Sequence, residues 1–96
     1  MDKPNRLGFL EGMLYANGPW FNGLRVVVYP NDHRPAHVHV IGGGKEAVFN
    51  LQCPSGPVEL RENYGFSRLD IRHIEQALEQ ALLTLCAEWR KIHGEP

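Results

Sequence analysis

The sequence predicts an α+β fold, in which a small antiparallel sheet of three to four strands packs against one long C-terminal helix. Between about residue 7 and residue 60, short apolar runs are separated by Gly, Pro and Asn, a pattern typical of strands and turns. Between residues 67 and 93, apolar residues recur at spacings of three and four, as in an amphipathic helix. Strands grouped first and a helix last are typical of the α+β class.

The chain length predicts a single domain over residues 1–96. Two domains would each be near the size at which a hydrophobic core fails without disulfides or metals. The composition, with 43% hydrophobic and 22% charged residues, is globular and excludes a disordered tail or a coiled-coil rod. A chain this short buries only roughly 60–70% of its unfolded surface, so a partner surface would add to a small core.

Four segments are candidate strands. Gly8–Tyr15 is weakly apolar and is followed by a turn sequence, and a short helix is the alternative for this segment. Leu24–Tyr29 is a β-branched run. Ala36–Ile41 and Glu46–Leu51 each alternate apolar and polar residues, and the glycine-rich segment 42–45 between them predicts a hairpin turn.

The helix is predicted to begin after the N-cap residue Ser67 and to end at Gly94. Its apolar stripe comprises Ile71, Ile74, Leu78, Leu82, Leu85, Trp89 and Ile92. About 27 residues would span roughly 40 Å, which exceeds the diameter of so small a domain. Either the helix breaks, or part of it packs on another chain. We expect the second outcome, with Leu83 and Cys86, which widen the apolar surface, contacting a partner protein or a second copy of the chain.

A cluster of polar residues in segment 31–39 is the strongest candidate for a chemical function. His37 and His39 alternate on one predicted strand, so both rings leave the same face, about 6–7 Å apart at their bases. Two imidazoles at this spacing can converge on one zinc, nickel, iron or copper ion. His33 or Asp32, in the preceding loop, would supply a third ligand. The sequence does not identify a cofactor; a divalent transition metal, such as zinc, is the candidate that this cluster could hold.

The same residues allow two other interpretations. Histidine side chains titrate near neutral pH, so His37, His39 and His33 could act as a general acid and base without a metal. Arg34, Arg25 and Lys45 would then hold a phosphate group, and RNA cleavage would be the reaction. Alternatively, the histidines are surface or hydrogen-bonded side chains with no ligand. The sequence leaves open whether the protein is an enzyme.

The charge balance and the termini limit the partners. Ten Lys and Arg residues against eleven Asp and Glu residues argue against bulk DNA binding, although a local RNA-contacting patch stays open. Two cysteines, Cys53 and Cys86, are too few for a disulfide framework or a four-cysteine zinc site. The N-terminal residues are not followed by the hydrophobic region of a signal peptide, and no segment approaches the ~18 apolar residues of a membrane span. We expect a cytoplasmic protein.

The segment 28–40, with its D-H-x-P-x-H-x-H pattern, resembles the signature of a small bacterial family of domains of unknown function, number 4160. Ala47-Val48-Phe49 matches the family's next strand, Gly65-Phe66-Ser67 matches its helix start, and Trp89 lies near the helix end. The resemblance covers roughly residues 24–92. Two departures stand out: Ala36 replaces a proline, and segment 52–57 is similar to an inserted loop.

The resemblance implies a biological setting and no particular reaction. Relatives of this kind are often encoded beside a second small protein, in pairs similar to toxin–antitoxin modules. Our leading hypothesis is therefore an interaction module that binds a partner, or itself, through the C-terminal helix. The alternatives are a metal-binding or acid–base hydrolase or ribonuclease that uses His33, His37 and His39, and a phage or mobile-element inhibitor that acts by binding.

Overall fold

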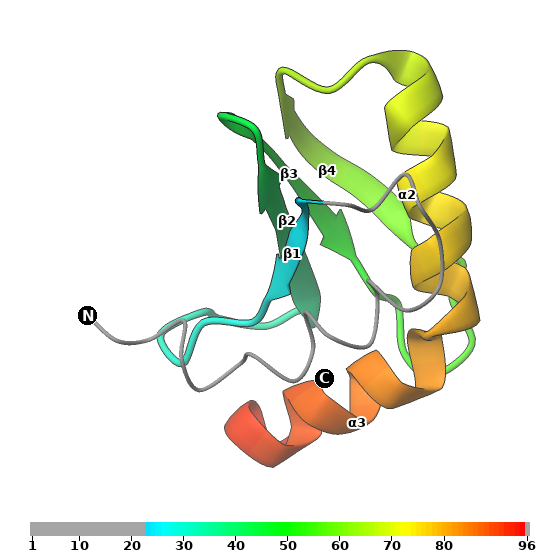
Figure 1. Cartoon of the computed structure of the whole chain (residues 1–96). Coiled ribbons are helices and arrows are strands. Elements are labelled where there is room, and N and C mark those ends of the chain that lie inside the picture. The colour runs from blue at the N-terminus through cyan, green and yellow to red at the C-terminus, as the bar shows by residue number, and fades with distance from the viewer. Residues whose placement is uncertain (1–22, 96) are drawn as a thin grey trace.

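A computed structural model describes residues 23–95 and shows an α+β arrangement of one sheet and two C-terminal helices (Figure 1). The four strands are antiparallel and lie in chain order across the sheet. Their bounds are β1, Arg25–Val27, β2, His37–Gly42, β3, Lys45–Asn50, and β4, Glu59–Tyr64. The helices are α2, Arg68–Gln80, and α3, Leu82–His93.

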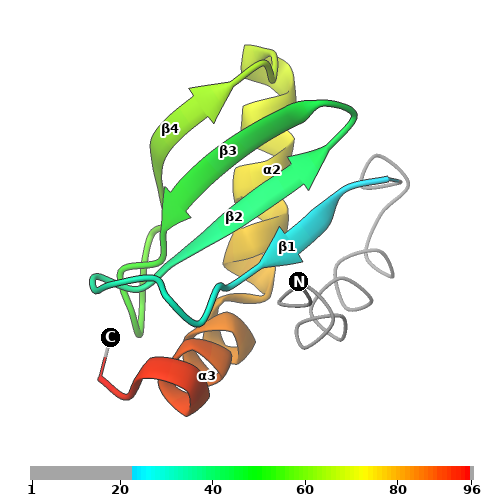
Figure 2. The ribbon, with the colours of Figure 1, turned by 90° about the vertical axis from the view of Figure 1, so that its left-hand side faces the viewer.

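The core lies between one face of the sheet and the two helices. Period-two alternation places Val38 and Val40 of β2 on this face, beside Ala47 and Phe49 of β3, and all four are fully buried. Figure 2 looks onto the sheet with α2 running behind it and α3 lying below the end at which β2 begins. His37 and His39, which alternate with the two valines, therefore leave the opposite face of the strand.

The prediction of one long helix is wrong, because the helix breaks at Ala81 and α3 runs in a new direction (Figure 1). Neither Pro nor Gly stands at the break; Ala81 leaves helical geometry with φ −102° and ψ 9°. The described part of the chain measures 32 × 30 × 24 Å, so a straight helix of roughly 40 Å would project past the core. The break lets Leu85 and Trp89 of α3 reach full burial.

Three of the candidate strands are confirmed within one or two residues as β1, β2 and β3. The candidate Gly8–Tyr15 lies outside the described residues. The fourth strand of the sheet is instead β4, whose sequence gave no apolar alternation because all six of its residues are exposed at the sheet edge. Its pairing with β3 contains an irregularity between Val48 and Phe49.

Two local predictions, the hairpin turn in segment 42–45 and the N-cap at Ser67, are confirmed. Gly43 and Gly44 form the turn between β2 and β3 with φ values of 58° and 78°, a region that glycine enters without steric cost. The hydroxyl oxygen of Ser67 accepts a hydrogen bond of 3.0 Å from the amide of Asp70, which caps α2.

Sequence reasoning assigned no bond to the cysteines, but Cys53 and Cys86 form a disulfide. The disulfide ties the loop between β3 and β4 to α3. Cys86 is only 2% exposed, so its side chain does not lie on the surface that we predicted for a partner. Leu83, the other residue of that prediction, is 73% exposed. Among the described residues, no helix has the length and apolar character needed to cross a membrane.

Candidate metal centre

The site begins with two local structures that aim three side chains at one point. Alternation on β2 sends His37 and His39 to the same face of the strand. Asp32 follows β1 in a turn: its amide donates to the carbonyl of Tyr29 over 3.0 Å, and its carboxylate accepts from the amide of Tyr29 over 3.2 Å. This side-chain-to-backbone turn, typical of aspartate, fixes the carboxylate beside the histidine strand.

The three side chains converge closely. Nε2 of His37 lies 3.4 Å from Oδ2 of Asp32, and Nε2 of His39 lies 3.2 Å from the same oxygen. The three ligand atoms all lie within 4.8 Å of one another. In a tetrahedral site with bonds of about 2.0–2.1 Å, neighbouring ligand atoms are about 3.3–3.4 Å apart. The spacing between the carboxylate and each imidazole therefore suits a bound transition metal.

The second ring nitrogen of each histidine has its own partner. Nδ1 of His37 lies 2.8 Å from the carbonyl oxygen of Pro35, which can only accept, so Nδ1 carries the hydrogen. Nδ1 of His39 lies 3.1 Å from Oε2 of Glu46 on β3. In metal sites, a carbonyl or carboxylate at this position fixes the tautomer and the ring orientation of a ligating histidine. Both rings thus present Nε2 toward Asp32.

This arrangement brings electron-pair donors together. When each Nδ1 carries the hydrogen, Nε2 of His37, Nε2 of His39 and Oδ2 of Asp32 all face one another with lone pairs. Either additional protons on the imidazoles or one cation must lie between them. One divalent cation would satisfy all three atoms, whereas two protonated imidazoles would give an acid–base cluster.

Aromatic rings enclose the cluster. The Tyr29 ring meets the His39 ring edge-on at 4.9 Å, and the Trp89 ring lies 5.3 Å from the His37 ring. The His93 ring stacks on Trp89 at 4.0 Å, and its Nε2 lies 3.0 Å from the carbonyl oxygen of Tyr29. Because α3 supplies Trp89 and His93, this helix holds the far side of the site against the end of β1.

The cluster is mostly covered but keeps an opening. The side-chain exposures are 16% for Asp32, 5% for His37 and 15% for His39. Burial, followed by the nearby Glu46 carboxylate, raises the pKa of Tyr29 above its usual 10.0, and Arg25 opposes this in part. The phenol at the edge of the site is therefore neutral at physiological pH.

The structure brings together three of the four predicted ligands and leaves one out. His33 is exposed on the loop and is not a member of the cluster. Lys45, which the metal-free alternative places beside a bound phosphate, lies on β3 opposite the end of β2 that is far from His37, roughly 17 Å along the strand. Arg34 is exposed on the loop.

Sequence reasoning missed Glu46, Trp89 and His93 as parts of the site. A signal existed for Glu46: the hairpin turn fixes a register in which Ile41 pairs with Glu46 and His39 pairs with Val48, so Glu46 is a diagonal neighbour of His39. No local signal existed for the two α3 residues, because they reach the site only through the helix break.

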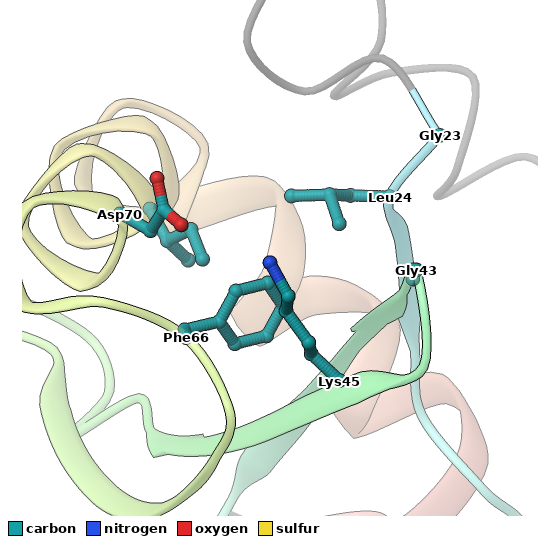
Figure 3. Close-up of a pocket in the computed structure, with 8 residues that line it drawn as sticks. Gly23, Leu24, Gly43, Lys45, Phe66 and Asp70 are labelled. Atoms are coloured by element: carbon teal, nitrogen blue, oxygen red, sulfur yellow. The ribbon is translucent and has the colours of Figure 1, made fainter.

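A separate cavity of about 300 Å³ lies at the other end of the sheet, between the β2–β3 turn and the first turn of α2. Figure 3 shows Leu24, Lys45, Phe66 and Asp70 directed toward the space between them, and the lining carries one charge of each sign. The Lys45 ammonium lies 5.8 Å from the centre of the Phe66 ring. None of the lining residues belongs to the histidine cluster.

The fold and the site define a small α+β domain with two histidines and one carboxylate at the start of its second strand. A scan against family models matches residues 23–90 to the Domain of unknown function (DUF4160), and the chain belongs to this family. The resemblance inferred from the sequence is thereby confirmed. Searches of curated proteins and of solved structures found no match.

Proposed function

We propose that this protein is a divalent transition-metal-binding domain in which Asp32, His37 and His39 are the ligands. The observation that carries the proposal is the convergence of Nε2 of His37 and Nε2 of His39 on one carboxylate oxygen. The carbonyl of Pro35 and the carboxylate of Glu46 behind the two rings support it, since both hold Nδ1 away from the ion.

The ligand set favours zinc and suggests a hydrolytic reaction. Two imidazoles and a carboxylate suit zinc, and also iron or nickel, whereas magnesium and calcium prefer oxygen ligands alone. Three protein ligands leave a fourth tetrahedral position for water, and zinc lowers the pKa of such a water to about 7. A hydrolase is therefore the enzyme class that this site would serve.

Metal content of the purified, untagged protein tests the proposal. We expect close to one zinc, nickel or iron per chain by elemental mass spectrometry, and its loss in Asp32→Asn and His37→Ala. His33→Ala is the matched control, because His33 lies on the same loop as Asp32 but outside the cluster. Metal-free wild-type protein that also fails to bind added zinc, or equal retention in all variants, would overturn the proposal.

A second candidate function, partner binding through α3, is supported by one observation. Leu83, at the start of α3, is 73% exposed and is the most exposed large hydrophobic side chain among the described residues. The partner would be a protein encoded nearby, as in a toxin–antitoxin-like pair, a target that the protein inhibits, or a second copy of the chain.

Size-exclusion chromatography and co-purification with the neighbouring gene product test this second candidate. Leu83→Glu should abolish assembly, and Leu69→Glu, an equally polar change at an exposed leucine of α2, should preserve it. Assembly that persists in Leu83→Glu would rule out this surface, and a metal-free His37→Ala protein should still assemble.

A further inference from the structure

The Cys53–Cys86 disulfide borders a surface cavity of about 370 Å³. The cavity is lined by Pro35, Ala36, Asn50, Gln52, Cys53 and Glu59. Only one of the two cysteines lines it: Cys53 is half-buried, whereas Cys86 is 2% exposed within the core. Of the two cysteines, Cys53 is therefore the one that a reagent in the cavity approaches.

Polar side chains border the cavity. At its rim, the amide of Gln52 donates to the carboxylate of Glu59 over 3.2 Å, and both residues are exposed. Asn50 also lines the cavity, but its side-chain oxygen Oδ1 is closed to solvent. The mouth of the cavity is therefore polar and open to small water-soluble molecules.

We propose that this cavity is a thiol-exchange site, at which a small water-soluble thiol attacks the sulfur of Cys53. The thiolate of the small molecule forms a bond to Sγ of Cys53, the Cys53–Cys86 bond breaks, and Cys86 leaves as a thiolate that takes up a proton. A second thiol of the same class then attacks the mixed disulfide, which releases the oxidised small molecule and leaves Cys53 as a thiol.

Thiol exchange at Cys53 changes the contacts that hold the histidine cluster in place. Cys86 lies one helical turn before Trp89, whose ring packs against His37. On the other side, Pro35 lines the cavity and its carbonyl holds Nδ1 of His37. Opening the disulfide frees α3 from the loop that contains Cys53. The resulting loss of metal affinity is the one consequence that rests on the proposed metal site.

Two single variants test which cysteine exchanges more readily, in the reverse direction, with the protein thiolate attacking a small disulfide. Cys86→Ser leaves only Cys53, and Cys53→Ser leaves only Cys86, and both lack the disulfide, so any loss of stability is shared. With glutathione disulfide, we expect Cys53 to form its mixed disulfide about tenfold faster or more than Cys86, measured by intact mass. Equal rates, or faster reaction of Cys86, would overturn the proposal.

A second experiment uses the wild-type protein. Reduced glutathione should open the native disulfide without denaturant, and a trapped adduct should map to Cys53 by peptide mass spectrometry. Reduction that requires unfolding, or an adduct on Cys86, would contradict the proposal.

Zinc affinity separates this inference from the proposed function. The double variant Cys53→Ser/Cys86→Ser contains no thiol that could bind zinc itself, and it should bind zinc several-fold more weakly than the oxidised wild type. If neither protein binds zinc, the metal proposal fails while the two exchange experiments still decide the thiol proposal. Equal zinc affinity would remove the coupling between the two sites.

Discussion

Glu46 shows how a residue outside the ligand set can control the site. Its carboxylate lies 3.1 Å from Nδ1 of His39, on the side of the ring opposite Asp32. A carboxylate in this position raises the basicity of the ligating nitrogen and fixes the ring orientation. The residue extends from β3, so the β2–β3 hairpin supplies both the ligand and its support.

Glu46→Gln should therefore weaken zinc binding by about tenfold to a hundredfold while the fold is kept. The glutamine oxygen can still accept the hydrogen bond, but the negative charge is lost. Competition with a chromogenic chelator measures the affinity. Glu62→Gln is the matched control, because Glu62 lies on β4 and bonds Tyr64 instead. Equal effects of the two substitutions would show that Glu46 acts only through the overall charge.

The secondary-structure elements differ in how far the sequence predicts them. Strands β1 to β3 have apolar residues at period two or in a continuous buried run, so local pattern alone finds them. The exposed edge strand β4 has no such pattern, and only its pairing with β3 makes it a strand. The break at Ala81 depends on the size of the core, which no local residue encodes.

The candidate site, like the secondary structure, was predictable only where a local sequence pattern encodes it. The strand alternation predicts that His37 and His39 share a face, and the loop places Asp32 close to them in sequence. The exclusion of His33 and the contact of Trp89 with His37 depend on the path of the loop and of α3. These are tertiary features, so sequence patterns do not report them.

The disulfide is the strongest single tie between the β3–β4 loop and α3. Its two cysteines are separated by 33 residues, and closing a loop of this length restricts the unfolded chain. Cys53→Ser/Cys86→Ser should lower the free energy of unfolding by about 3 to 4 kcal/mol, measured by urea denaturation of the oxidised wild type beside the variant. A difference near zero would mean that packing of α3 alone holds the loop in place.

At the scale of the whole molecule, metal binding and folding are linked. The ligands come from the loop after β1 and from β2, and they converge only in the folded chain. An ion that binds the folded state alone stabilises it by about 2.7 kcal/mol at a concentration one hundred times its Kd.

Zinc at that excess should raise the Tm by about 10 to 20 °C, because about 1 kcal/mol shifts the Tm of a domain this size by 4–8 °C. Scanning calorimetry with zinc, and then with a chelator, measures the shift and its reversal. Asp32→Asn should melt at the same temperature with and without zinc. A rise of equal size in that variant would place the stabilising ion elsewhere on the protein.

X-ray absorption spectroscopy at the zinc edge of the loaded, oxidised protein tests the central claim most directly. We predict a first shell of nitrogen and oxygen at about 2.0–2.1 Å, with the multiple-scattering signature of two imidazoles. The imidazole signature should disappear in His37→Ala/His39→Ala. Sulfur at about 2.3 Å, or an unchanged spectrum in the double variant, would contradict a metal centre at Asp32, His37 and His39.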